Sequence, residues 1–271
     1  MTKFKRWPLI LVIILVVTVL ASAMTVWHHQ QASRQYIDST APTLFLHGFG
    51  SSYHAEEKMV KAATKAGVTK TVVRIDVDKR GHVQYHGPSI RNKRNPIVEI
   101  NFEDSNLVNL PTNIQWLHSV ILTLQHRADI KSFNIVGHSM GNWTILAYLN
   151  RYGQDQSLPR LRKQVVLAGG GVNGWRTKTD KRWCAYMKPY LRHLSSNYPH
   201  AAVLNICGDL DDGSHSDGVV PNAVSKSLKP LLGNRPSKYR LVTIHGKKAQ
   251  HSALHNNSQV NRLIINFIWK R

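Results

Sequence analysis

The sequence predicts an α/β fold in which a mostly parallel β-sheet carries helices on both faces. From residue 42 onward, apolar segments of strand length alternate with segments whose apolar residues recur at helical spacing. Residues 133–136 form one such strand, which runs directly into a helix through Gly137-His138-Ser139-Met140-Gly141. Glycine-rich segments also follow two other predicted strands. Because such sheets carry their sites at the carboxyl ends of the strands, we expect a functional site at that edge.

The predicted strands are bounded by turns rich in glycine, asparagine, aspartate or proline. They cover residues 42–46, 71–77, 97–102, 133–136, 164–168, 201–207 and 239–244. The predicted helices cover residues 54–66, 112–124, 222–232 and 258–269, together with the helix that follows Ser139. We expect Thr112 to cap the second of these helices. In the last helix, apolar residues recur at i, i+3, i+4, i+7 and i+8, which indicates one buried face.

Residues 173–200 are too long for a simple connection between a strand and a helix. We expect them to form an insertion over the edge of the sheet that carries the site. Aromatic residues stand among its lysines and arginines: Trp175, Trp183, Tyr186 and Tyr190. These side chains could line an acyl or aromatic pocket, contact a membrane surface, or pack onto the domain.

The first 41 residues are expected to lie outside the globular domain. An almost uninterrupted apolar segment, residues 9–27, follows Lys3, Lys5 and Arg6, and it could span a bilayer. Residues 21–23 resemble a signal-peptidase site, so residues 1–27 are predicted to be a removed signal peptide or a retained signal anchor. Residues 28–41 are polar and predict a linker, which leaves residues 42–271 as the domain. Both alternatives predict export, with the domain secreted or held on the extracellular side of the membrane.

The chain is strongly basic, with a formal net charge of +21 and a pI of about 10.2. This charge favours anionic surroundings such as lipid head groups or an acidic cell-wall polymer, although a basic surface that only aids solubility is an alternative. Lysine and arginine are spread along the chain without a nucleic-acid-binding module, so nucleic acid is not an expected partner. The two cysteines, Cys184 and Cys207, exclude a disulfide scaffold and leave their pairing open.

Ser139 is the predicted nucleophile. In a Gly-x-Ser-x-Gly sequence between a strand and a helix, the chain turns so sharply that larger residues at both glycine positions would collide with the backbone. The turn exposes the serine Oγ, and the Met140 amide at the start of the helix can stabilise an oxyanion. An ordinary strand–turn–helix is the alternative interpretation.

A serine nucleophile needs a histidine base and a carboxylate, here in the chain order Ser, Asp, His. The candidate acids all follow the strand at 201–207: Asp209, Asp211, Asp212 and Asp217. The candidate bases lie between the last strand and the last helix: His245, His251 and His255. His251, in the middle of that loop, is preferred. The clustered acids could bind Ca²⁺ with Ser214 and His215, but their spacing is not that of an EF-hand, so no metal or cofactor is expected.

From about residue 42 to its end, the chain resembles the α/β-hydrolase superfamily in its His47-Gly48 loop, its GHSMG motif and its late Asp and His. The sequence from His251 to Asn261 is similar to the catalytic-histidine segment of small secreted bacterial lipases, which implies His251 as the base. An acid-x-x-Val-Pro pattern of many hydrolases matches residues 217–221 and implies Asp217. The resemblance also implies the Phe49 amide as an oxyanion donor beside that of Met140. NPIVEINF, SDGVVP and AQHSALH together resemble exported Gram-positive cell-surface hydrolases.

These features predict an exported serine hydrolase, a carboxylesterase or a lipase-like enzyme, that cleaves an ester through an acyl-enzyme intermediate. The expected substrate is an ester in a lipid or an acylated cell-wall component. An acyltransferase that uses the same three residues is one alternative, and a non-catalytic binding module of the cell surface is another. Unlike the small lipases, this chain has a long aromatic insertion, which leaves the size of the substrate open.

Overall fold

A twisted, mostly parallel sheet is the centre of the computed structural model, which describes residues 7–175 and 177–271. In this part of the chain the sheet has eight strands in the order β3-β2-β4-β1-β5-β6-β7-β8. Every neighbouring pair is parallel except β2 and β3. The strands are β1 Thr43–Leu46, β2 Val72–Val77, β3 Val83–His86, β4 Ile97–Phe102, β5 Ser132–His138, β6 Arg160–Leu167, β7 Ala202–Asp209 and β8 Lys238–His245. The predicted fold class is confirmed.

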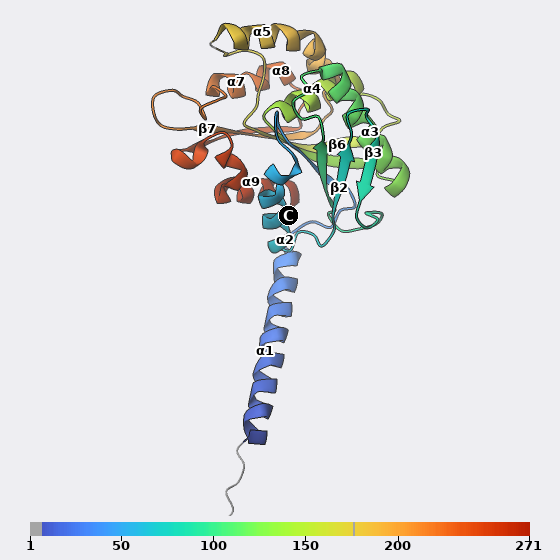
Figure 1. Cartoon of the computed structure of the whole chain (residues 1–271), viewed down its shortest axis with the longest axis vertical. Helices are drawn as coiled ribbons and strands as arrows, with labels where there is room; N and C mark the ends of the chain where they lie inside the picture. Colours follow the sequence, from blue (N-terminus) through green and yellow to red (C-terminus); the bar gives the residue numbers. More distant parts are fainter. Residues whose placement is uncertain (1–6, 176) are drawn as a thin grey trace, which may run out of the picture.

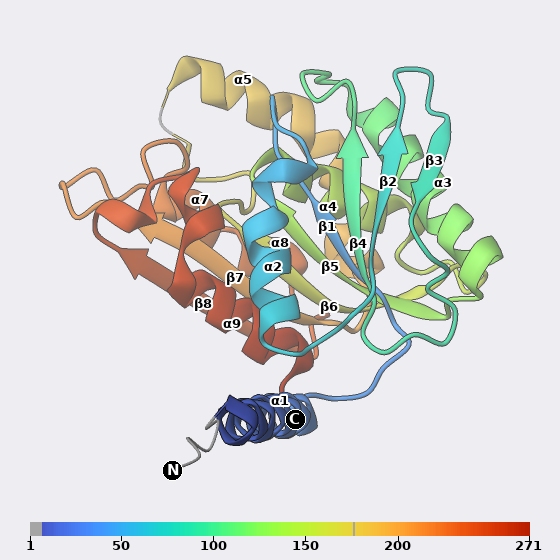
Figure 2. The ribbon, with the colours of Figure 1, turned by 60° about the horizontal axis from the view of Figure 1, so that its bottom comes forward.

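Helices cover both faces of the sheet (Figures 1 and 2). One face packs against α3 (Leu110–Ala128), α4 (Met140–Tyr152), α6 (Leu194–Asn197) and α8 (Leu228–Leu232), and the other against α2 (Glu57–Lys65) and α9 (Ser258–Trp269). Successive residues of a strand point to opposite faces, so Leu44 and Leu46 join the first core while Phe45 joins the second. This double coverage explains why the central strands are continuous apolar runs.

Short 3₁₀ helices lie in the connections near the carboxyl edge of the sheet and in the insertion. They are η1 Tyr53–Ala55, η2 Lys188–Leu191, η3 Lys247–Ala249 and η4 Ala253–Asn256. Residues 173–200 contain α5 (Lys178–Met187), η2 and α6, which lie over the carboxyl edge of the sheet (Figure 1). Arg176 lies outside the described residues.

Three local predictions were wrong. The polar segment after β2 contains the edge strand β3, in which Val83 and Tyr85 are half-buried while their neighbours face solvent. Asn109, and not Thr112, caps α3, because the Asn109 side chain accepts a hydrogen bond from the Thr112 amide. The helix expected at 222–232 is two helices, α7 (Asn222–Lys226) and α8, because Pro230 has no amide to bond back to Lys226.

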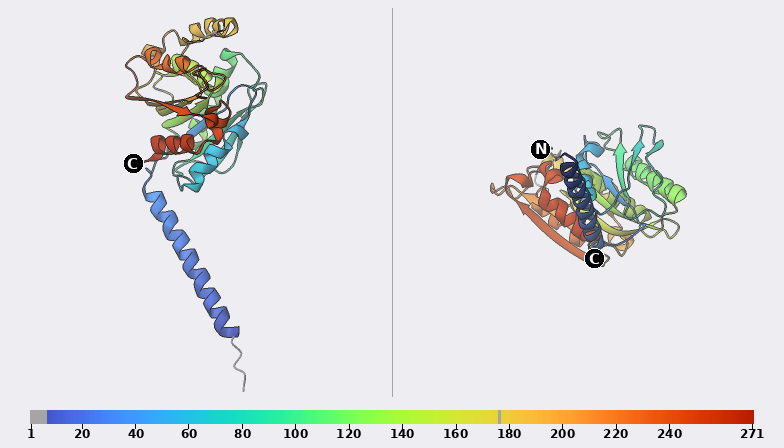
Figure 3. Two further views of the ribbon diagram at one scale, coloured as in Figure 1. Left: turned by 90° about the vertical axis from the view of Figure 1, so that its left-hand side faces the viewer. Right: turned by 90° about the horizontal axis from the view of Figure 1, so that it is seen from below.

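The N-terminal helix α1, Trp7–Arg34, extends away from the domain (Figures 1 and 3). Its large apolar side chains from Ile10 to Leu20, and that of Met24, are exposed. No helix in the described part of the chain combines the length and apolar composition needed to cross a membrane. The basic residues at positions 3, 5 and 6 lie outside the described residues, and the signal peptide or signal anchor stays a prediction.

The predicted linker at 28–41 differs from what the structure contains. Helix α1 continues to Arg34, and the next residues pack onto the domain. Tyr36 is buried and pairs with Lys270, and the Ile37 amide donates to the Trp269 carbonyl over 2.8 Å. The globular domain therefore begins at about Tyr36, because this segment packs against the end of α9.

Candidate active site

Ser139 lies in the sharp turn between β5 and α4, as the motif predicts. Its backbone has φ 48° and ψ −121°, outside the regions that residues with a side chain ordinarily adopt. Such a conformation costs about 1–3 kcal/mol, and it persists only where the surroundings enforce it. Strained backbone of this kind is concentrated at functional sites, so the turn marks Ser139 as the centre of a candidate site.

Two glycines allow the turn to pack against the end of β1. A Cβ atom on Gly141 would lie 2.5 Å from the His47 carbonyl oxygen, which is too close for any other residue. A Cβ atom on Gly48 would lie 3.0 Å from the Cβ of Ser139. The loop after β1 and the turn after β5 are therefore in direct contact, although some 90 residues separate them along the chain.

The structure brings the predicted serine, histidine and aspartate together. His251 Nε2 is 3.0 Å from Ser139 Oγ, and His251 Nδ1 is 2.8 Å from Asp217 Oδ2. Because an ionised carboxylate can only accept, Nδ1 carries the proton and Nε2 is free to accept one from the serine. The other carboxylate oxygen of Asp217 accepts from the amides of Val219 and Val220 over 2.9 and 2.7 Å. Asp217 and His251 are both buried, so these bonds hold the imidazole in one orientation.

Two further histidines pack behind His251: His138, for which the sequence analysis predicted no role, and His255, which it considered only as an alternative base. The ring of His138 lies 4.7 Å from the ring of His251 and 3.8 Å from that of His255. His255 in turn bonds through Nδ1 to the Ala55 carbonyl oxygen over 3.1 Å. Burial lowers the pKa of His255 to about 4 and the pKa of His138 well below its usual range. Both rings are therefore neutral at pH 7, and they support His251 without placing a positive charge beside it. The sequence signals for these two residues are that His138 directly precedes Ser139 and that His255 lies in the same predicted loop as His251.

The remaining candidate acids and His245 lie away from Ser139. His245 is exposed and bonds to Asp211 over 2.7 Å, which raises the pKa of the histidine. Asp209 accepts hydrogen bonds from the Asn222 side chain and from the Asp211 amide. Ligand atoms of Asp209, Asp211 and His245 lie within 4.8 Å of one another, a spacing that a metal ion could use, but these atoms already bond to one another and to Asn222. Asp212 caps a turn by accepting from the Ser214 amide.

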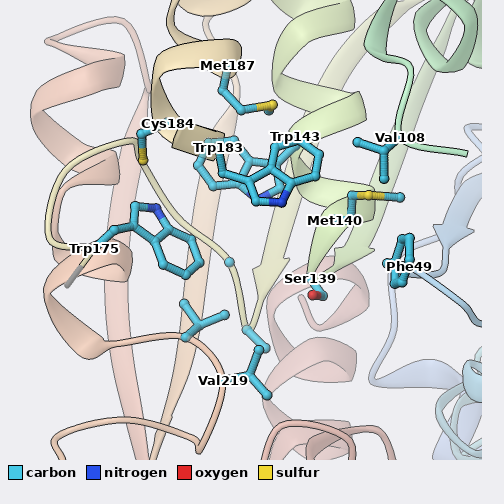
Figure 4. Close-up of a pocket in the computed structure, with 13 residues that line it drawn as sticks. Phe49, Val108, Ser139, Met140, Trp143, Trp175, Trp183, Cys184, Met187 and Val219 are labelled. Carbon is cyan, nitrogen blue, oxygen red and sulfur yellow. The ribbon is translucent and has the colours of Figure 1, made fainter. Parts of the chain in front are cut away.

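A cavity of about 340 Å³ opens beside Ser139 (Figure 4). It is lined by Phe49, Val108, Ser139, Met140, Trp143, Ala168, Gly169, Trp175, Trp183, Cys184, Met187, Val219 and Val220. None of these described lining residues is charged, and three of them are tryptophans. The volume lies at the lower end of the range of ligand pockets, about 300–1,000 Å³. The cavity can therefore hold a small apolar group with its reacting atom at Ser139.

Phe49 and Met140, the predicted oxyanion residues, border this same cavity (Figure 4). Met140 is the first residue of α4, and a helix leaves its first amides without a partner inside the helix. Among the backbone hydrogen bonds of the described residues, the Phe49 amide takes part in none. Both amides are thus free to donate to an oxygen bound next to Ser139.

The insertion forms the roof of the cavity. Met187, Leu191 and Leu194 are buried against α4 and the first core, and they attach the insertion to the domain. Trp175 and Trp183 line the cavity, whereas Tyr186 is exposed and Tyr190 is half-buried against the core. Two of the roles that the sequence left open, lining a pocket and packing onto the domain, are thus filled by different aromatic residues, and contact with a membrane stays a prediction. Cys184 and Cys207 are both buried, and no disulfide joins them.

The fold and this arrangement define an α/β hydrolase. Residues 30–271 match the family described as "Alpha/beta hydrolase of unknown function (DUF915)", and the chain belongs to that family. The superfamily resemblance seen in the sequence is thereby confirmed. A search among curated proteins found no match.

Solved structures share the fold at low sequence identity. A gene product of Listeria innocua is 20% identical with a TM-score of 0.73, over 85% of this chain and 94% of its own. A candidate cell surface hydrolase from Lactobacillus plantarum is 19% identical with a TM-score of 0.66, over 84% and 89%. Est1E from Butyrivibrio proteoclasticus is 11% identical with a TM-score of 0.51, over 84% and 86%.

Proposed function

We propose that this α/β hydrolase is a serine hydrolase that cleaves a carboxylic ester through an acyl-enzyme intermediate. The observation that carries the proposal is the hydrogen-bonded series from Ser139 Oγ through His251 to Asp217, at the mouth of an apolar cavity. A non-catalytic binding module has no need for a strained serine aligned with a buried histidine and carboxylate. The series therefore favours an enzyme over the cell-surface binding module.

In the proposed reaction, His251 Nε2 takes the proton of Ser139 while Oγ attacks the ester carbonyl carbon. The negative charge that develops on the carbonyl oxygen is stabilised by the amides of Phe49 and Met140. His251 then gives its proton to the leaving alcohol, and the acyl group stays on Ser139. Water, activated by the same imidazole, releases the acid, while Asp217 holds the imidazole and stabilises its positive charge throughout.

A fluorophosphonate probe tests the enzyme class directly, because it labels only an activated serine. The full chain is expected to be labelled and to hydrolyse p-nitrophenyl esters, and Ser139→Ala is expected to do neither. His245→Ala is the matched control for loss of a nearby histidine, since His245 ends β8 with an exposed side chain that pairs with Asp211. Absence of labelling in the wild type contradicts the proposal. Product analysis with an added alcohol separates a hydrolase from the alternative acyltransferase.

We further propose that the enzyme is exported and acts at an anionic cell surface, on a lipid or an acylated cell-wall ester. The basic and apolar N-terminal sequence and the net charge of +21 support export and attraction to such a surface. Outside α1, the exposed large apolar residues of the described chain are four: Phe49, Val108, Tyr186 and Val219. All four border the cavity at Ser139 or the hollow next to it. A rim of this kind suits a substrate that is held in an apolar layer.

Vesicle flotation at several salt concentrations tests the surface proposal. The full chain is expected to bind vesicles that contain anionic lipid more tightly than neutral ones, and the difference is expected to fall as salt screens the charges. A Tyr186→Ser, Val219→Ser double variant is expected to bind less tightly than the wild type, and α1 is common to both proteins. Equal binding to neutral and anionic vesicles at low salt would contradict the proposed attraction to an anionic surface.

A further inference from the structure

A second hollow adjoins the cavity at Ser139, and two side chains line both of them. The second hollow is open to solvent and is lined by Val108, Arg182, Trp183 and Tyr186. Of these, Val108 and Trp183 also line the cavity at Ser139. Arg182 and Tyr186 do not border that cavity. The Trp183 side chain, on α5, thus forms part of the wall between the apolar cavity at Ser139 and a more open, partly basic hollow.

The chemistry of the inner cavity restricts what can occupy it. Its described lining carries no charged side chain, and Ser139 supplies the hydroxyl at which the reaction takes place. The sulfur of Cys184 already donates to the Val172 carbonyl over 2.8 Å. A charged or strongly polar acyl group would lose its hydration there without gaining partners, whereas an apolar chain gains from burial.

The size of the cavity limits the length of that chain. A volume of about 340 Å³ holds about eleven groups of the size of a water molecule, at about 30 Å³ each. A methylene group is of similar size. Allowing for imperfect filling, the space accommodates a chain of about ten carbons, and a longer chain meets the wall that contains Trp183.

The wall is held in place by the helix that carries it. Cys184 and Met187, on the same helix, are buried, and Met187 packs into the main core. The Trp183 ring itself packs against that core and meets the Tyr186 ring edge-on, with centroids 5.6 Å apart. These two contacts place the half-buried Trp183 ring at the wall of the cavity.

We propose that Trp183 closes the acyl cavity and makes the enzyme selective for esters of apolar acyl chains of up to about ten carbons. This inference rests on the proposed serine-hydrolase function. With the indole removed, the inner cavity and the outer hollow become continuous, and longer chains can pass from Ser139 into the open hollow.

The test is kcat/KM of the full-length protein on p-nitrophenyl esters from acetyl to hexadecanoyl. For the wild type we expect kcat/KM to rise with each methylene, by up to about fourfold, the effect of burying one CH₂. It is expected to fall beyond about ten carbons. Trp183→Ala is expected to move the optimum to longer chains and to raise the ratio of tetradecanoyl to octanoyl hydrolysis by at least about tenfold.

Two variants keep the result interpretable. Trp183→Phe retains a ring, so we expect a smaller shift of the acyl-chain optimum. If circular dichroism shows that Trp183→Ala is unfolded, the optimum of Trp183→Phe serves as the test of the proposal. Arg182→Ala changes the neighbouring residue on the same helix, which borders only the open hollow, and its optimum is expected to equal that of the wild type.

The possible failures are distinguishable. If fluorophosphonate does not label the wild type and no ester is hydrolysed, the proposed function itself is wrong. If the wild type is labelled and active but prefers acetyl esters, the assignment of the cavity is wrong. If a folded Trp183 variant loses activity equally on esters of all chain lengths, or keeps the wild-type dependence of kcat/KM on chain length, Trp183 does not determine which acyl chains the enzyme prefers.

Discussion

Replacement of Glu56 by glutamine is expected to stabilise this protein at alkaline pH and to leave its stability at acidic pH unchanged. Glu56 precedes α2 and is almost completely buried, and neither of its carboxyl oxygens has a hydrogen-bond partner among the described residues. Burial, and to a lesser degree the nearby Glu99, raises the pKa of Glu56 to about 8. Burial also raises the pKa of Glu99, on β4, to about 7. Two buried acids therefore share one region of the second face of the sheet.

The direction of the effect follows from proton binding. Below pH 4.5, the ordinary value for a glutamate, both the folded and the unfolded chain hold the proton of Glu56. Between pH 4.5 and about 8, the unfolded chain loses this proton and the folded chain keeps it, so stability falls as the pH rises. At 1.36 kcal/mol per pKa unit, the loss from Glu56 reaches up to about 5 kcal/mol above pH 8. Glutamine cannot ionise, so the variant does not suffer this loss.

Urea denaturation of the full chain, followed by tryptophan fluorescence, measures the effect at pH 5, 7 and 9. The difference in unfolding free energy between Glu56→Gln and the wild type is expected to stay below about 1 kcal/mol at pH 5 and to grow to about 5 kcal/mol at pH 9. Glu57→Gln is the matched control, because Glu57 is the next residue but is only half-buried and its carboxylate pairs with Lys61 and His54. A difference that is the same at pH 5 and at pH 9 would refute the reasoning.

Ionisation of Glu56 is also expected to affect the candidate active site. The Ala55 carbonyl, next to Glu56, accepts the hydrogen bond of His255, and the His255 ring packs on His138 beside Ser139. Ionisation of Glu56 would loosen the segment around Ala55. It would thereby disturb His255 and His138, which pack behind His251. We therefore expect the wild type to lose activity on incubation at pH 9 faster than Glu56→Gln does.

Three further predictions concern the site itself. Ser139→Ala should abolish ester turnover and leave the circular dichroism spectrum unchanged; residual turnover at the wild-type rate would exclude Ser139. His251→Ala should lower kcat on the order of 10⁴-fold or more, and His245→Ala should leave kcat within about twofold, both measured on one ester at saturation. Gly141→Ala should lower the unfolding free energy by about 1–3 kcal/mol, since its Cβ would lie 2.5 Å from the His47 carbonyl oxygen, and should reduce kcat as well; an unchanged melting temperature would contradict the close contact.

Much of the site was accessible from the sequence, because its signals are local. The turn at Ser139 is encoded by two glycines within five residues, and the order Ser, Asp, His along the chain follows from the topology of the sheet. These local signals selected the three residues that the structure places within hydrogen-bond distance of one another. Strand β3 also had a local signal, the alternation of Val83 and Tyr85 with polar residues, which the surrounding polar sequence obscured.

Other features depend on which segments meet in space, and only the tertiary structure decided them. Four aspartates follow β7, and although a motif resemblance implied Asp217, only the fold of the loop shows that Asp217 reaches His251 while Asp209, Asp211 and Asp212 form other hydrogen bonds. The insertion sequence does not distinguish Trp183, which lines the cavity, from Tyr186, which is exposed, because which side of their helix meets the core and which meets water depends on the tertiary packing. Glu56 and Glu99 lie 43 positions apart, and they share one buried region only because α2 covers β4. Periodicity and motifs determine the elements and the order of reactive groups along this chain, whereas the contacts between distant segments determine which of those groups are buried, paired or exposed.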